Sequence, residues 1–439
     1  MIKKIFSFFC TGLFSLSAFA QTLDKQKLDQ YFDALEQSNK FMGSVAISKN
    51  GKIVYNRAIG YADLAAKKKP DVNTKYRIGS ISKTFTSTLI FKAIEENKLT
   101  LDDKLSKFYP QIKNADKISI GNLLNHRSGI HNFTDDLIYL SWNTQKKSES
   151  EMLEIITAGG SDFEPDSKAE YSNSNYVLLS YILQKTYKKT YAKLLIEKII
   201  VPAGLKNTYF GDRINPSKNE SYSYKFSSDW VKETETDMSV PMGAGAIVST
   251  PGDLTLFADA LFNGKIVAAK SVEMMKTLKD DYGYGLFQMP FNDKQSYGHT
   301  GGIDGFSSVF GYFQEEKVGF ALCSNGSNYN NNNISIVLLS TIFNVNYEIP
   351  DFKTYAVSAA DLEPYLGVYS SKEIPLKITI TKNENVLMAQ ATGQSGFGLE
   401  ATAKDKFKFD MAGVVLEFNP AEKKMILKQG GGVFTFVKE

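Results

Sequence analysis

The stretch that decides the expected fold is Arg77-Ile-Gly-Ser80-Ile-Ser-Lys83-Thr-Phe-Thr-Ser87. It has the pattern of a loop that enters a helix, because Gly79 permits a tight turn and Ser80 can begin the helix. Three positions on a helix are just under one turn, so Lys83 would lie on the same face as Ser80. A neighbouring amine can take the proton of a serine hydroxyl, and a helix N-terminus favours a developing oxyanion. The stretch predicts a serine nucleophile with a lysine base, and an ordinary N-cap serine is the alternative that this motif alone leaves open.

The first 20 residues have the pattern of a secretory signal peptide. Lys3 and Lys4 precede a mainly apolar run, and the small residues around Ala20 predict cleavage after that position. The apolar run is shorter than the roughly 20 residues of a membrane span, and a retained N-terminal anchor is the alternative. We therefore expect an exported protein, either periplasmic or secreted.

Charge and cysteine content restrict the expected partners. The net charge of +3 would fall to +1 when cleavage removes Lys3 and Lys4 without any acidic residue. A nearly neutral chain gives no reason to expect nucleic acid or an anionic membrane as partner. Only Cys323 would remain after cleavage, so we expect no internal disulfide and an inert, buried thiol. The oligomeric state stays open.

Two patterns in the larger part of the chain predict an α+β fold. Ser44–Ser48 and Ile53–Tyr55 flank Asn50-Gly51, which is a strong signal for a hairpin in an antiparallel sheet. Helical periodicity fills the middle of the chain, at 135–142, 149–157, 175–185 and 191–200. Strand patterns return at 283–289, 295–299, 306–313 and 318–324, and a closing helix follows at 334–343. We expect an antiparallel sheet flanked by helices, with an all-α insertion.

The end of the chain predicts a separate domain. Short, often alternating strands follow one another from Leu376 to Phe436 and indicate a small antiparallel β-barrel-like domain. The expected organisation is a signal peptide at 1–20, a main domain at 21–346, a linker at 347–359 and the small β domain at 360–439.

Tyr171-Ser-Asn173 is the second motif that can carry chemistry. Alternate residues of an extended loop point the same way, so the phenol and the amide would both face a cleft. A tyrosine near cationic groups can have a lowered pKa and pass protons, while a carboxamide can fix a carbonyl and hold a lysine. A turn with a buried tyrosine is the alternative.

Tyr297-Gly-His299-Thr300-Gly301-Gly302 is the third motif, at the end of an expected strand. Its glycines would expose backbone groups to an extended substrate, and His299 and Thr300 would offer cationic or hydroxyl contacts to a carboxylate. A glycine turn with a surface histidine is the alternative.

No metal or other cofactor is expected. His126 and His131 have no third ligand near them in the sequence. We interpret His126 as a hydrogen-bonded structural residue under the helix that follows Ser80.

The three motifs, in this order and separation, resemble those of the penicillin-recognising serine hydrolases, which include class C β-lactamases and DD-carboxypeptidases. Leu123-Leu-Asn-His126-Arg-Ser-Gly129 and the stretch from Gly243 to Pro251 are also similar to segments of this family, and the resemblance covers about residues 24 to 345. The C-terminal part resembles the small β domain that is often appended to such enzymes.

The resemblance implies a role for each motif. Ser80 would be acylated, with Lys83 and Tyr171 sharing proton transfer. Asn173 would orient the substrate, and the backbone N–H groups of Ser80 and Gly302 would form the oxyanion hole.

The third motif also bears on the substrate. The resemblance implies that His299 and Thr300 bind a substrate carboxylate, and Gly301 and Gly302 are also expected to bind substrate. Class C β-lactamases have lysine where this chain has His299. The variant is similar to that of some DD-carboxypeptidases and D-amino-acid peptidases, and a neutral histidine binds a carboxylate less strongly than an ammonium does. We expect a hydrolase of cell-wall-type peptides that end in a D-amino acid. A carboxylesterase, a class C-like β-lactamase and a non-enzymatic penicillin-binding sensor are the alternatives.

Overall fold

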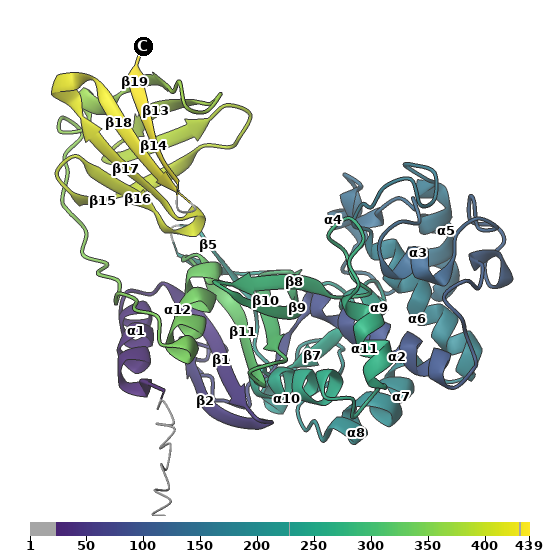
Figure 1. Cartoon of the computed structure of the whole chain (residues 1–439). Helices are drawn as coiled ribbons and strands as arrows, with labels where there is room; N and C mark the ends of the chain where they lie inside the picture. The colour runs from purple at the N-terminus through teal and green to yellow at the C-terminus, as the bar shows by residue number, and fades with distance from the viewer. Residues whose placement is uncertain (1–22, 228, 430–431) are drawn as a thin grey trace, which may run out of the picture.

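The computed structural model describes residues 23–227, 229–429 and 432–439 (Figure 1). The predicted signal peptide therefore lies outside the described residues. Among those that are described, none of the helices has both the length and the apolar character needed to cross a membrane.

A six-stranded antiparallel sheet lies at the centre of the larger part of the molecule. In spatial order its strands are β2 (Lys52–Ile59), β1 (Phe41–Lys49), β11 (Val318–Ser327), β10 (Phe306–Phe313), β9 (Lys294–Ile303) and β8 (Phe287–Phe291). Asn50 and Gly51 join β1 to β2 with φ angles of 51° and 70°, as a tight hairpin requires. The hairpin and the antiparallel sheet are as predicted.

One predicted strand is displaced. The sequence pattern placed it at 283–289, but β8 begins at Phe287. Gly285 has a φ of 73°, and Gly283 N donates to Leu286 O, so this part of the chain forms a tight turn before the strand.

Helices cover both faces of the sheet (Figure 1). On one face α1 (Lys25–Gln37) and α12 (Asn331–Phe343) bury an apolar layer against it that includes Phe32, Val45 and Leu338. On the other face α10 (Pro251–Phe262) packs with α2 (Ser82–Glu95) in the largest hydrophobic core. Cys323 in β11 is part of this core, and burial raises the pKa of its thiol, as expected for an inert residue.

The middle of the chain is mainly helical, as the periodicity predicted. The helices of this part are α3 (Ile120–Leu124), α4 (Tyr139–Trp142), α5 (Glu149–Gly159), α6 (Asn173–Tyr187), α7 (Tyr191–Leu195), α8 (Val201–Ala203) and α9 (Met242–Gly245), and α11 (Ala269–Lys276) follows α10. The short strands of this part are β3 (Tyr76–Arg77), β4 (Tyr209–Phe210), β5 (Tyr224–Phe226), β6 (Trp230–Lys232) and β7 (Ile247–Ser249).

The C-terminal part is a closed eight-stranded antiparallel barrel, so the predicted barrel-like architecture is correct. Side chains alternate between its interior and solvent, and Phe407, Met425 and Phe436 lie at the centre. Its strands are β12 (Gly367–Ser370), β13 (Lys377–Asn383), β14 (Val386–Ala391), β15 (Phe397–Ala403), β16 (Lys406–Phe409), β17 (Val414–Asn419), β18 (Lys424–Gln429) and β19 (Gly432–Lys438).

A buried lysine joins the barrel to the rest of the molecule. Residues 345–358 run from α12 towards the barrel without helix or strand (Figure 1). Lys40, just before β1, pairs with Glu400 at 2.7 Å and Asp410 at 3.1 Å, both of which belong to the barrel. The Lys40 side chain is 6% exposed, so this contact holds the barrel beside the sheet domain.

Candidate active site

Ser80 lies in a single 3₁₀ turn, η1 (Gly79–Ile81), directly before α2. Gly79 has a φ of 51°, and a Cβ atom there would meet backbone atoms of Gly302 at 2.7–2.8 Å. Only glycine allows this close approach. The turn therefore brings the Ser80 hydroxyl beside the glycine-rich end of β9.

Lys83 is fully buried one turn further along the chain. Its Nζ lies 3.0 Å from Ser80 Oγ, 2.7 Å from Asn173 Oδ1 and 2.8 Å from Ala244 O. Burial lowers the pKa of Lys83 well below its usual value, because the ammonium has lost its water. A neutral amine fits these partners: it donates its two N–H groups to Asn173 and Ala244, and its lone pair accepts the Ser80 hydroxyl. The arrangement can activate Ser80 as a nucleophile.

Tyr171 is buried beside Ser80. Burial raises the pKa of its phenol, and the hydrogen bond with Ser80 only partly opposes this rise. The expectation of a lowered pKa is therefore wrong, because the loss of solvent outweighs the favourable contact. A protonated phenol beside Ser80 is suited to donate and return a proton rather than to act as a standing base.

His126 packs against the ring of Tyr171. Its ring stacks on the Tyr171 ring with centroids 4.5 Å apart, and the Ser172 N–H donates to His126 Nδ1 at 3.1 Å. Burial, together with nearby Lys83 and His299, lowers the pKa of His126 well below its ordinary value. A neutral, buried and hydrogen-bonded ring agrees with the structural role expected for it.

Asn173 is the first residue of α6, and both the oxygen and the nitrogen of its side-chain amide form hydrogen bonds. Asn173 Nδ2 donates to Asn132 Oδ1 at 3.2 Å and to Thr134 Oγ1 at 3.0 Å, while Oδ1 accepts from Lys83. In this state Asn173 positions the lysine, and a substrate carbonyl would have to replace one of these partners. Sequence reasoning missed Asn132 and Ala244, although the small-residue stretch around Ala244 was a signal of close backbone packing.

His299 is buried near Lys83 but does not line the cleft beside Ser80, and it carries no charge. The residue is 2% exposed, its Nδ1 lies 2.5 Å from Thr300 O, and its ring packs on Phe287 with centroids 4.5 Å apart. Burial, assisted by nearby Lys83, lowers the pKa of His299 to about 3. The ring is neutral near pH 7, which corrects the expectation of a cationic contact to a carboxylate.

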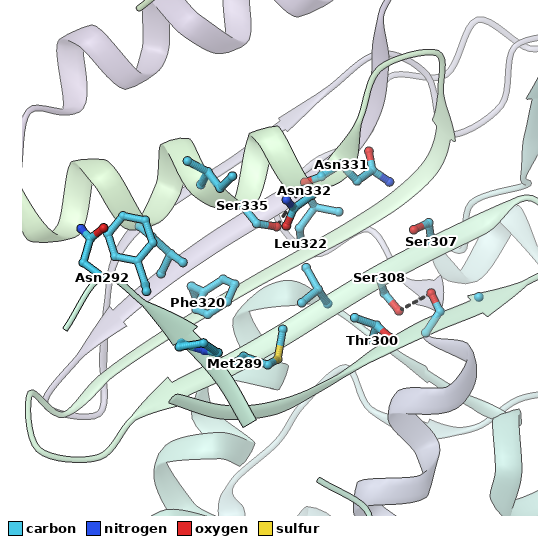
Figure 2. Close-up of a pocket in the computed structure, with 17 residues that line it drawn as sticks. Met289, Asn292, Thr300, Ser307, Ser308, Phe320, Leu322, Asn331, Asn332 and Ser335 are labelled. Carbon is cyan, nitrogen blue, oxygen red and sulfur yellow. Dashed lines mark hydrogen bonds between the residues drawn. The ribbon is translucent and has the colours of Figure 1, made fainter. Parts of the chain in front are cut away.

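Thr300 lies on the opposite side of β9, because successive strand residues alternate between faces. It lines a cavity of about 910 Å³ between α12 and strands β8 to β11, together with Met289 and Phe320 (Figure 2). Ser80 does not line this cavity. Although the cavity is large, it is therefore not the catalytic cleft. The placement of Thr300 gives no support to its expected contact with a substrate carboxylate.

The last two glycines of the motif lie against the Ser80 turn. A Cβ atom on Gly301 would lie 2.0 Å from Ile78 O, so only glycine fits there. Gly302 lines the cleft that contains Ser80. Its position agrees with the expected pairing of backbone groups with a substrate, which stays a prediction.

The cleft beside Ser80 has a volume of about 370 Å³. Among the described residues that line it, Lys225 is the one cation, and Glu233 and Asp304 are the carboxylates. Buried Arg77 donates to Asp304 at 2.8 Å, while Lys225 Nζ lies 3.6 Å from Glu233. Within residues 23–227, 229–429 and 432–439, no cluster of three His, Cys, Asp or Glu side chains could hold a metal.

The fold and the constellation around Ser80 define a serine hydrolase. The family model named Beta-lactamase matches residues 28–337, so the chain belongs to this family.

Three similar proteins carry different names. Penicillin-binding protein 4* of Bacillus subtilis (strain 168) is 26% identical over 440 residues, which cover 93% of this chain and 97% of the relative. Teichoic acid D-alanine hydrolase of Staphylococcus aureus is 27% identical over 307 residues, 68% of this chain and 73% of the relative. The crystal structure of D-amino acid amidase from Ochrobactrum anthropi SV3, complexed with L-phenylalanine amide, has a TM-score of 0.64 and 25% identity over 73% of this chain and 99% of that chain.

Proposed function

We propose that the protein is an exported hydrolase that cleaves peptides or related acyl compounds of a D-amino acid through an acyl-enzyme at Ser80. The observation that carries the proposal is the buried Lys83 amine, 3.0 Å from Ser80 Oγ and fixed by Asn173 and Ala244. This geometry supplies a nucleophile and its base in one turn of chain.

The positions of these groups support the following mechanism. Lys83 accepts the Ser80 proton while Oγ attacks the carbonyl carbon, and the backbone N–H groups of Ser80 and Gly302 stabilise the oxyanion. The neutral Tyr171 phenol relays a proton to the departing amine or alcohol. Water then attacks the acyl-enzyme by the reverse sequence of proton transfers, which releases the acid and restores the Ser80 hydroxyl.

The third motif does not decide between these substrates. Because His299 is neutral, it gives little attraction to a carboxylate, whether that of a β-lactam or that of a peptide that ends in a D-amino acid. The names of the relatives concern D-amino acid amides, D-alanine and penicillin. A D-amino-acid peptidase of the DD-carboxypeptidase type is therefore the first proposal. The alternative proposals are a carboxylesterase, a class C-like β-lactamase and a slowly acylating penicillin sensor.

Export belongs to the same proposal, because peptides of the cell wall lie outside the cytoplasm. It rests on the signal-like pattern of residues 1–20 and the expected cleavage after Ala20. N-terminal sequencing of the protein recovered from the cell envelope or the medium tests it. A mature chain that begins at Gln21 supports export.

One panel of substrates tests the activity. Purified protein and the Ser80→Ala variant are given a D-Ala-D-Ala peptide, a D-amino acid amide, a short nitrophenyl ester, a chromogenic cephalosporin and a fluorescent penicillin. We expect turnover of the peptide or the amide and slow labelling by penicillin, all lost in Ser80→Ala. Rapid cephalosporin hydrolysis would identify a lactamase, ester turnover alone an esterase, and labelling without any turnover a sensor. Turnover that persists in Ser80→Ala would reject Ser80 as the nucleophile.

A further inference from the structure

Beside the Ser80 cleft there is a second cavity, of about 690 Å³, which is lined by β5 and by barrel residues that include Gly398 and Met411. Figure 1 shows β5 next to the barrel. Lys225 and Asp304 line both this cavity and the Ser80 cleft. The two hollows are therefore neighbours, and a substrate longer than one or two residues that leaves the cleft past Lys225 enters the space beside the barrel.

The carboxylates of this second cavity are already paired. Glu400 and Asp410 bind Lys40, and Asp304 binds Arg77. Their charges are compensated within the protein, so the cavity does not favour a strongly charged ligand.

The remaining wall offers amides and aromatic faces. The asparagine-rich loop before α12 contributes Asn328 and Tyr329, and α12 itself contributes Asn331, while Phe409 and Met411 come from the barrel. Asn331 Oδ1 is shielded from solvent and has no hydrogen-bond partner among the described residues. Side-chain amides can donate and accept at once, and aromatic rings pack on the apolar faces of ligands that carry polar groups at their edges. This combination suits a chain of sugar rings, whose hydroxyl and acetamide groups alternate with C–H faces.

We propose that this cavity binds the glycan part of a polymeric substrate, and that the barrel thereby takes part in substrate selection. The inference rests on the proposed hydrolase function, because the bound glycan would carry the acyl group that reaches Ser80. It gives a role to two features that the chemistry at Ser80 leaves unused, the asparagine-rich loop and the C-terminal barrel.

The test compares two variants with a matched control. Met411→Trp fills the cavity from the barrel side, and Asn328→Ala removes an amide from the opposite wall. Val433→Trp places the same large ring on a barrel residue that is 61% exposed and does not line the cavity. Binding of a tetramer of N-acetylglucosamine is measured by calorimetry in the Ser80→Ala background, and kcat/KM is measured for a glycan-linked peptide and for the same peptide without sugar.

We expect the tetramer to bind Ser80→Ala protein and to bind more weakly after Met411→Trp or Asn328→Ala. The ratio of kcat/KM for the glycan-linked peptide to that for the free peptide should fall about tenfold, the effect of losing one good contact. Val433→Trp should change neither quantity.

Two results would overturn the inference: no binding of the tetramer, or equal losses for both peptides, which would place peptide rather than glycan in the cavity. Because binding is measured without turnover, these results are distinct from failure of the proposed function, which would appear as no turnover of any small substrate.

Discussion

At the scale of the residue, the site is governed by burial more than by neighbouring charges. Lys83, Tyr171 and His299 all lie where water is excluded, and in each case loss of solvent is the largest cause of the pKa shift. Each shift favours the uncharged form. In the free enzyme the phenol and the imidazole are neutral near pH 7, and the Lys83 amine loses its proton at a lower pH than an ordinary lysine does.

The protonation of Lys83 predicts the pH profile. Lys83 works as a base only when it is deprotonated, so activity should be low at acid pH and rise as the pH passes its lowered pKa. We expect kcat/KM for a small D-amino acid amide to reach its plateau well below about pH 10.4, where an ordinary lysine titrates. A profile that rises only near that pH would contradict the neutral amine. Lys83→Arg, which stays protonated, should lose about 10²–10⁴-fold in kcat/KM.

Tyr171→Phe tests the proton relay separately. The variant keeps the ring that stacks on His126 but loses the hydroxyl, so we expect kcat to fall about 10²–10⁴-fold with little change in thermal stability. Stopped-flow measurements of acylation and deacylation would show which step depends on the phenol. Unchanged rates of both steps would leave Lys83 as the sole proton-transfer group.

At the scale of the element, the site depends on the contact between β9 and the turn η1. Gly301 and Gly79 let the two backbones approach within van der Waals distance, and this contact places Gly302 next to Ser80. Residues 79–83 by themselves define only half of the catalytic geometry. The other half comes from a strand that lies more than 200 positions later in the sequence.

Gly301→Ala should separate these elements. Its Cβ would lie 2.0 Å from Ile78 O, so the strand must move, at a cost of about 1–3 kcal/mol in the free energy of unfolding. We expect a large loss of kcat as well, because the oxyanion donors would no longer be aligned. Gly396→Ala is the control, since a Cβ there meets nothing closer than 3.8 Å. The free energy of unfolding in urea and kcat are measured for both variants. Equal values of both quantities in Gly301→Ala and Gly396→Ala would refute the close contact.

At the scale of the whole molecule, the buried side chain of Lys40 links two parts that each have their own hydrophobic core. The sheet domain and the barrel each have their own hydrophobic core, and Lys40 lies between them with Glu400 and Asp410. Residues 345–358 complete the covalent connection. The position of the barrel beside the cleft therefore depends on a few polar contacts rather than on a continuous core.

Lys40→Met should loosen the barrel. The change leaves Glu400 without this partner and Asp410 with Lys408 as its partner, and since Glu400 is 40% exposed, we expect a loss of roughly 1–3 kcal/mol, less than for a fully buried pair. Limited proteolysis in the segment 345–358 should become faster. Lys353→Met is the control, because Lys353 is 89% exposed and, among the residues that the structure describes, forms an ion pair only with Asp351 in the same segment. Equal cleavage rates in the two variants would mean that Lys40 does not hold the barrel.

Several features followed from local patterns. The Asn50-Gly51 hairpin, the helical middle region and the alternating barrel strands were predictable because turn geometry and side-chain periodicity act over a few residues. The start of β8 was not, because Gly285 and its neighbours form a turn that the apolar pattern conceals. The raised pKa of Tyr171 was missed, and the charge of His299 was left open between a cationic and a neutral ring, for a different reason. Burial depends on distant parts of the chain.

The sequence by itself determined that Ser80 and Lys83 lie one turn apart, because helical geometry fixes that spacing. Only the tertiary structure decided what surrounds them. Asn173 and Ala244 reach Lys83 from 90 and 161 positions away, and together with the surrounding core they exclude water from its amine. The charge of a lysine depends on its solvent, and the solvent at this site is removed by residues that meet only when the whole chain has folded.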